Sequence, residues 1–168
     1  MLMQIDLTLE QENLMQERLR EQECVSIAGM LKFMKEHFGE KAYEIFVNAQ
    51  GEGRRSHFSK LAEENGDNSI EALVKIIFES NNEQASEYTM VETESGFQMN
   101  VTKCWPYKIA KRHGIMEQLF LTCCSCEQFF VEGFNPDIGF TRTKTLMLGD
   151  DCCDHFFYYK DKDAGEQH

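Results

Sequence analysis

The spacing of apolar residues changes near the middle of the chain, and this change constrains the fold more than any other feature. Between residues 8 and 38, apolar side chains recur every three or four positions, as on one face of an α-helix. From about residue 87 onward, separate segments show apolar and polar side chains that alternate with a period of two, which is typical of half-buried strands. Helices followed by such strands predict an α+β fold, with helices packed on one face of an antiparallel sheet.

The helical lobe is expected to cover about residues 8–80. Thr8 and Gln11 have the spacing of a capping box, which predicts that the first helix begins there. Gly39 is expected to end this helix, because glycine readily adopts the backbone conformation of a helix C-terminus. Further helices are predicted at residues 40–48, 56–64 and 69–79, with a turn over the QGEGRR stretch at residues 50–55.

The α+β portion is expected to cover about residues 87–160 and to contain about four strands in two hairpins. The predicted strands are Tyr88–Glu94, Phe97–Lys103, Ile138–Leu148 and Cys153–Tyr159. Two helices are expected between the hairpins, at residues 107–113 and 116–131. We expect both portions to form a single domain over residues 1–168, because this length is typical of one domain.

The composition argues against two classes of partner. The formal net charge is −12, whereas binding to nucleic acid or to an anionic membrane surface needs a basic face. Hydrophobic residues make up 42% of the chain, which is enough for a core, but no apolar run has the length of a membrane span. The first residues lack the basic and apolar segments of a signal peptide, so a cytoplasmic protein is expected.

Seven cysteines are a high and odd number for a chain of this length. In a reducing compartment no disulfide framework is expected, so some thiols should be buried and others should react or bind metal. Cys123 and Cys126 have C-x-x-C spacing and would share one face of a helix, so they are candidate metal ligands. A structural zinc site usually needs a second such pair. The sequence therefore does not decide between a bound divalent metal such as zinc and no cofactor.

The last predicted strand places a thiol beside an imidazole. Cys153, His155, Phe157 and Tyr159 share one face, because alternate side chains of a strand point the same way. Cys153 and His155 could form an activated thiolate pair, or they could supply two ligands of a zinc-type site. The alternative is a core strand with one hydrogen-bonded histidine, since free cysteine is often buried.

Cys104 lies two residues before Pro106, where a helix is predicted to begin. The dipole and free N–H groups of a helix N-terminus favour a thiolate, so Cys104 is a candidate nucleophile. The alternative is an ordinary buried thiol at the end of a strand, and position alone does not decide between the two.

Arg142 and Lys144 are predicted to lie on the same, otherwise apolar, face of a strand. Two cations in such a place could anchor a carboxylate. Asp150, Asp151 and Asp154 follow closely in the sequence and are candidate ion-pair partners of these cations. The alternative is that the twist of the strand carries both cations to solvent, where an ion pair contributes little to stability.

The run from Cys104 to Tyr158 contains a distinctive combination of motifs. VTKC is followed by a cysteine cluster on a predicted helix and, within residues 133–158, by GFNP, RTKT and GDDCCD. This combination resembles the bacterial L-2-amino-thiazoline-4-carboxylic acid hydrolase family. The resemblance implies a helical N-terminal part, an α+β C-terminal part and hydrolytic opening of a five-membered ring that has a C=N bond beside sulfur. The substrate that it implies is a small molecule with a carboxylate.

Two positions depart from the pattern of this family. Trp105 separates Cys104 from Pro106, and Cys126 stands where the resemblance implies an acidic residue three positions after the first helix cysteine. If that acid is a catalytic base or a metal ligand, its replacement by Cys126 is expected to alter or abolish the activity that the resemblance implies.

Residue types, strand phase and the resemblance together suggest roles for the candidate residues. The expected roles are nucleophile for Cys104 or Cys153, proton carrier for Asp150 or Asp151, and substrate binding for Arg142, Lys144 and His155. A metal held by several thiols could instead activate water.

A second hypothesis is a non-catalytic module that binds or senses a small ligand or a metal in a cysteine-lined pocket. A third is a structural role for the cysteines in the core, and a homo-oligomer stays open under all three.

Overall fold

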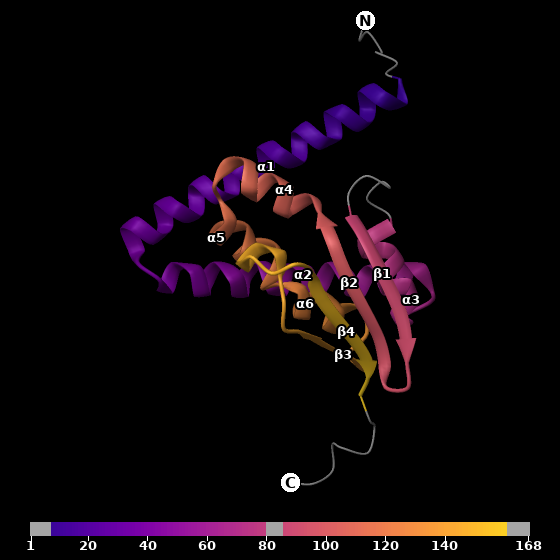
Figure 1. Cartoon of the computed structure of the whole chain (residues 1–168). Helices are drawn as coiled ribbons and strands as arrows, with labels where there is room; N and C mark the ends of the chain where they lie inside the picture. The colour runs from indigo at the N-terminus through magenta and orange to yellow at the C-terminus, as the bar shows by residue number, and fades with distance from the viewer. Residues whose placement is uncertain (1–7, 80–85, 161–168) are drawn as a thin grey trace, which may run out of the picture.

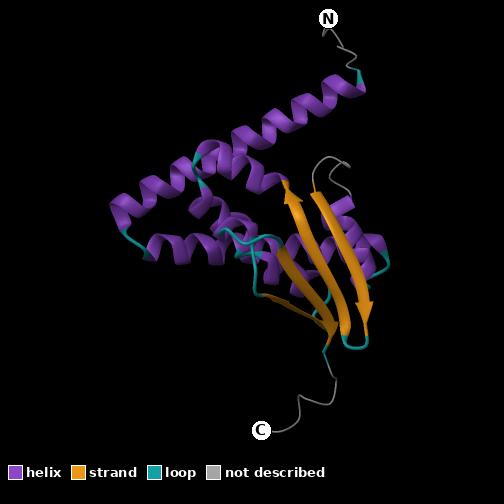
Figure 2. Cartoon of the chain, viewed as in Figure 1, coloured by secondary structure: helices purple, strands orange, loops and turns teal. Residues whose placement is uncertain are grey.

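The computed structural model describes residues 8–79 and 86–160, which form a helical N-terminal half followed by a four-stranded antiparallel sheet (Figures 1 and 2). The predicted α+β fold is therefore confirmed. The helices of the first half are α1 (Leu9–Phe38), α2 (Lys41–Asn65) and α3 (Ile70–Val74), and α3 continues into a π-helical turn (Lys75–Glu79). No helix within the described residues is long and apolar enough to cross a membrane.

Both predicted ends of α1 are confirmed. Thr8 accepts a hydrogen bond from the backbone N–H of Gln11, and the Gln11 side chain accepts one from the backbone N–H of Thr8 at 2.9 Å. This reciprocal capping box satisfies two backbone donors that a helix start leaves without partners. Gly39 ends the helix with a φ of 74°, a conformation that glycine adopts at little cost.

The predicted turn at residues 50–55 is wrong, because α2 runs through it without interruption. The helix continues because this segment packs closely against α6 (Glu127–Phe134). Gly51 lies so near the ring of Phe129 that a Cβ atom at this position would overlap the ring. Arg55 also donates a hydrogen bond to Glu132 of α6 at 2.7 Å. Tertiary packing thus outweighs the cost of glycine in a helix, which is about 1 kcal/mol per residue.

The same close approach predicts a large cost for a small substitution in α6. A Cβ atom at Gly133 would overlap the backbone carbonyl of Arg55, which cannot move without displacing α2. We expect Gly133→Ala to lower the free energy of unfolding by about 1–3 kcal/mol, the usual cost of overpacking, as measured by urea denaturation. The matched control is Gly53→Ala, because no atom lies within 4 Å of a Cβ at Gly53. An unchanged stability for Gly133→Ala would show that the two helices separate readily.

The strands are β1 (Ser86–Thr93), β2 (Gly96–Cys104), β3 (Ile138–Arg142) and β4 (Cys153–Tyr159). Their order in the sheet is β1-β2-β4-β3, and every neighbouring pair is antiparallel. The two predicted hairpins therefore form, and they join through β2 and β4. The register places Met99 of β2 opposite His155 of β4, and places Arg142 of β3 opposite the same histidine.

One face of the sheet packs on α3 and α6 and forms the larger core. Its buried residues include Ile70, Leu73, Val74, Met99, Val101, Phe130, Val131, Phe134, Ile138, Leu146, Cys153 and Phe157. Met99, Val101, Cys153 and Phe157 alternate with more exposed residues along β2 and β4, as a strand with one buried face requires. Cys153 and His155 share one face of β4, as predicted, and the side chains of both are buried.

The chain between β2 and β3 is less regular than the sequence predicts. It contains α4 (Trp105–His113), α5 (Met116–Leu119), a π-helical turn (Phe120–Cys124) and α6. The single helix expected at residues 116–131 is therefore wrong, because helical hydrogen bonding breaks at Ser125 and Cys126. This break rotates the residues after it, so Cys123 and Cys126 do not share a regular helix face.

The strand expected at Ile138–Leu148 is also too long. It ends at Arg142, because the side chain of Asp154 accepts hydrogen bonds from the backbone N–H groups of Thr143 and Lys144. Asp150 in turn accepts one from the backbone N–H of Thr145 at 2.7 Å. Short carboxylate side chains thus take the place of a neighbouring strand, as they do in many turns.

Candidate active site

Three side chains from separate elements meet beneath one face of the sheet and form what we call the Glu127 cluster. Glu127 is the first residue of α6, Arg142 is the last residue of β3, and His155 is central in β4. One carboxylate oxygen of Glu127 pairs with Nη1 of Arg142, and the other lies 3.2 Å from Nε2 of His155. Nη2 of Arg142 also donates to the backbone carbonyl of Cys124 at 3.4 Å. Cross-strand register and the start of α6 therefore position the whole cluster.

The Glu127 cluster is largely buried. His155 is 3% exposed, and the side chains of Arg142 and Glu127 are 12% and 15% exposed. The rings of Phe78, Phe140 and Phe157 lie with their centroids 5.7–6.2 Å from the imidazole of His155. Charges in such apolar surroundings interact more strongly than they would in water, and they must be paired to be tolerated.

His155 presents one ring nitrogen that has no partner. Among the side-chain nitrogen and oxygen atoms that are buried in the described part of the chain, Nδ1 of His155 is the one that makes no hydrogen bond. When Nε2 carries the proton and donates to Glu127, Nδ1 has a free lone pair. Leaving a buried polar atom unsatisfied costs about 1–3 kcal/mol, and such exceptions are typical of functional sites. The arrangement can therefore accept a proton from a bound molecule.

Three thiols lie near the Glu127 cluster, and two of them have strongly shifted pKa values. Burial is the main cause that raises the pKa of Cys104 to about 12, although the backbone N–H of Tyr107 acts in the opposite direction. Burial likewise raises the pKa of Cys124. Cys104 does precede α4, as expected, but desolvation outweighs the backbone hydrogen bond from the start of this helix. Of the two alternatives for Cys104, the structure thus favours the buried thiol over the thiolate.

The third thiol, Cys153, is held by hydrogen bonds to the chain segment that follows β3. Its sulfur accepts a hydrogen bond from the backbone N–H of Leu146 at 3.4 Å and donates to Oγ1 of Thr145 at 3.6 Å. The hydroxyl of Thr145 reaches Sγ of Cys124 at 4.0 Å. Thr145 is itself buried, so this short chain of polar contacts holds two thiols inside the core beside the cluster.

The two cations expected on one face do not share it. Arg142 points inward to Glu127, whereas Lys144 follows the end of β3, is exposed, and pairs with Asp151 at 3.1 Å. The predicted pairing of Lys144 with Asp151 is therefore confirmed. For Arg142 the prediction of Asp150, Asp151 or Asp154 as the partner is wrong. Asp150 and Asp151 are exposed in the loop before β4, and their role as proton carriers stays a prediction.

Of the two cysteines of the C-x-x-C motif, Cys123 lies before the helix break and Cys126 lies within it. Cys126 donates to the backbone carbonyl of Leu121 at 3.5 Å, and Cys123 lies 3.6 Å from the hydroxyl of Thr122. Among residues 8–79 and 86–160, no group of three or more histidine, cysteine or acidic side chains is arranged to hold a metal ion. Within these residues, Cys123 and Cys126 therefore have no third side chain of these types placed to bind a metal ion with them.

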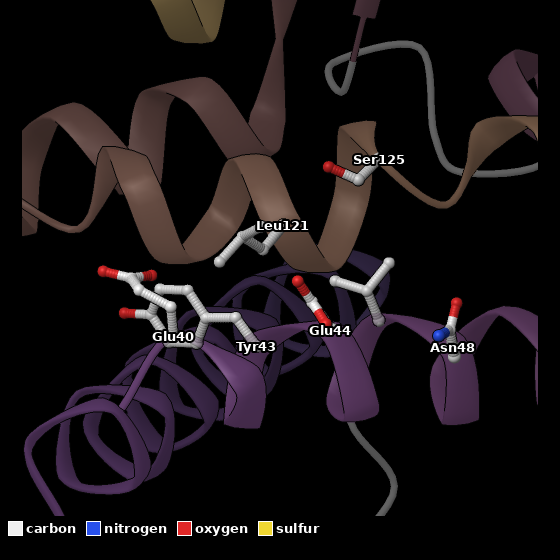
Figure 3. Close-up of a pocket in the computed structure, with 7 residues that line it drawn as sticks. Glu40, Tyr43, Glu44, Asn48, Leu121 and Ser125 are labelled. Atoms are coloured by element: carbon white, nitrogen blue, oxygen red, sulfur yellow. The ribbon is translucent and has the colours of Figure 1, made fainter. Parts of the chain in front are cut away.

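A groove of about 460 Å³ opens elsewhere on the molecule, between the start of α2 and the π-helical turn before α6 (Figure 3). Glu40, Tyr43 and Glu44 lie on one side of it, and Leu121 and Ser125 lie on the other. None of the residues predicted from the sequence as catalytic, substrate-binding or metal-binding lines this groove. The chemistry of the Glu127 cluster is therefore separate from it.

Sequence reasoning missed Glu127, although the signal for it was present. An acid was expected three positions after the first cysteine of the cluster, where Cys126 stands. Counted from Cys124, the same spacing falls on Glu127, and the structure places this carboxylate between Arg142 and His155. The departure at Cys126 therefore does not remove an acid from the site.

Most of the chain matches a known protein family. A family model described as L-2-amino-thiazoline-4-carboxylic acid hydrolase matches residues 17–157, which include most of α1, the whole sheet up to Phe157, and the Glu127 cluster. No protein in a search of curated sequences matches the chain.

Proposed function

Because the chain belongs to the L-2-amino-thiazoline-4-carboxylic acid hydrolase family, we propose that it hydrolyses a ring C–N bond in a small cyclic amidine that carries a carboxylate. The observation that carries this proposal is the free Nδ1 of His155, a buried proton acceptor held in place by Glu127. A histidine oriented by a carboxylate is the usual general base of hydrolytic enzymes.

In the proposed mechanism, Nδ1 of His155 takes a proton from water, and the oxygen adds to the amidine carbon of the ring. The resulting tetrahedral carbon carries the ring nitrogen, the ring sulfur, the exocyclic amine and the new hydroxyl. His155 returns this proton to the ring nitrogen. The bond from the carbon to that nitrogen then breaks as the new hydroxyl becomes a carbonyl, and His155 passes the hydroxyl proton to the same nitrogen, which leaves as a primary amine. One water is consumed, and the product is an open-chain amine with a thiocarbamate.

Glu127 and Arg142 have supporting roles in this mechanism. The carboxylate of Glu127 orients the imidazole and stabilises the imidazolium that forms when Nδ1 gains a proton. Arg142 fixes Glu127 through Nη1, while its Nη2 makes only a long contact of 3.4 Å with a backbone carbonyl. We propose that Nη2 is the donor that meets the carboxylate of the substrate, which keeps Arg142 in the substrate-binding role.

A cysteine nucleophile is the alternative within the same reaction. Cys153 lies on the same face of β4 as His155, two residues away, and is better placed for it than Cys104, whose pKa is raised to about 12 by burial. If His155 activates water directly, Cys104→Ala and Cys153→Ala should each retain turnover within about tenfold of the unchanged protein. If a thiolate attacks, one of the two should lose activity by several orders of magnitude.

The direct test is incubation of the purified protein with 2-amino-thiazoline-4-carboxylate, followed by chromatography and mass spectrometry. We expect a product that is heavier than the substrate by one water. The matched control substrate is 2-amino-thiazoline without the carboxylate, which should turn over much more slowly because it cannot engage Arg142. Saturable binding of the carboxylate without turnover would instead support the non-catalytic binding module, and neither binding nor turnover would overturn the proposed substrate class.

A further inference from the structure

Helix α1 is apolar on two opposite faces, although only one of them packs on the rest of the chain. Cys24, Ala28 and Leu31 are buried and form the inner face. Met15, Leu19, Met30 and Phe33 are 47–56% exposed, and their spacing along the helix puts them on the other side. Isolated exposed apolar residues are ordinary, but a row of them along one helix marks an interaction surface.

We call this row the outer stripe, and it consists of Met15, Leu19, Gln22, Ser26, Met30 and Phe33. Successive members are three or four residues apart, which is the spacing of a helix seam that packs on another helix. The members are also arranged symmetrically, with small or polar residues in the middle and large apolar residues at both ends.

The symmetry of the outer stripe identifies its partner. Met15 pairs with Phe33, Leu19 with Met30, and Gln22 with Ser26, and each pair is centred on residue 24 or on the bond after it. A second copy of the stripe that runs in the opposite direction therefore places each apolar residue opposite another apolar residue. Such self-complementarity is the property of an interface with two-fold symmetry, in which the same patch serves both subunits.

The helix dipoles favour the same arrangement. Two antiparallel copies of α1 place the positive end of each helix dipole beside the negative end of the other, whereas two parallel copies would place like ends side by side.

We propose that the outer stripe of α1 packs antiparallel against the outer stripe of a second copy of this chain. Figure 1 shows that the N-terminal part of α1 extends past α4 and away from the sheet, which leaves room for a second helix along it. From Met15 to Phe33 the stripe is about 27 Å long at 1.5 Å per residue. One helix pair of this length buries an area at the low end for specific interfaces, so the dimer forms with a dissociation constant in the micromolar range, roughly 1–100 µM.

Sedimentation equilibrium of the full chain over a concentration series tests this proposal. We expect the average mass to rise from one chain towards two within roughly 1–300 µM. Leu19→Lys and Met30→Glu should each raise the dissociation constant at least tenfold, while circular dichroism confirms that the helices are retained. The control is Val91→Glu, which also charges an exposed apolar residue, but on β1. A chain that stays monomeric throughout, or that dimerises equally well with Leu19→Lys, would overturn the proposal.

Combining Leu19→Lys and Met30→Glu in one chain tests the direction of the helices. In the antiparallel dimer, the lysine introduced at position 19 of one copy faces the glutamate introduced at position 30 of the other. The double variant should therefore associate more tightly than either single variant. In a parallel dimer like charges would face each other at both positions, so the double variant would associate more weakly than either single one. That second outcome would overturn the antiparallel arrangement.

Discussion

Replacing His155 with glutamine is expected to lower kcat for ring opening by about 10²–10⁴-fold, the usual contribution of a general base. Glutamine is the informative substitution because its terminal amide can still donate to Glu127 from near the position of Nε2, whereas nothing replaces Nδ1. KM should change little if His155 acts on water and does not bind the substrate. Steady-state kinetics with 2-amino-thiazoline-4-carboxylate measure both quantities.

His113→Gln is the matched control for this substitution. His113 is partly exposed on α4 and contacts Glu21 at 2.6 Å, so it is also a histidine beside a carboxylate, but it lies outside the Glu127 cluster. We expect its kcat to stay within about twofold of the unchanged protein. If His155→Gln retained kcat within about threefold while remaining folded, His155 would not be the base, and the proposed mechanism would be wrong.

The sequence was sufficient to predict elements that are bounded by clear local signals. β4 is a short run of residues that mostly favour strands and it follows a polar loop, so its bounds and the shared face of Cys153 and His155 were predicted correctly. The capping box at Thr8 and the stop at Gly39 are local devices, and they also formed as predicted. In each of these cases the interactions that decide the structure join residues close in sequence.

Long-range contacts decided the features that the sequence did not reveal. Gly51 suggested a turn, but the approach of Phe129 from a distant helix keeps it helical. The end of β3 at Arg142 depends on Asp154, which is a strand away. The helix break at Ser125 and Cys126 hid Glu127, because a regular helix through residue 131 gives no reason for this residue to meet β3 and β4. Sequence reasoning therefore named Arg142 and His155 as candidates and missed Glu127, which only the packing of α6 brings to them.

Replacing Glu127 with glutamine is expected to lower the free energy of unfolding by about 3 kcal/mol, near the low end for breaking a buried ion pair. The substitution preserves shape, so the loss arises from Arg142, whose charge stays in a largely buried place with a weaker partner. Urea denaturation measures the change. Glu132→Gln is the matched control, because its partner Arg55 is much more exposed than Arg142, and a change below about 1 kcal/mol is expected there.

A double variant separates this electrostatic cause from a simple packing defect. Glu127→Gln with Arg142→Met removes both charges, so no buried charge is left unpaired, and most of the lost stability should return. Activity should not return, because the imidazole of His155 has lost the carboxylate that orients it. If the double variant were as unstable as the sum of the single changes, the cluster would be held by packing, and its charges would have to be explained by catalysis alone.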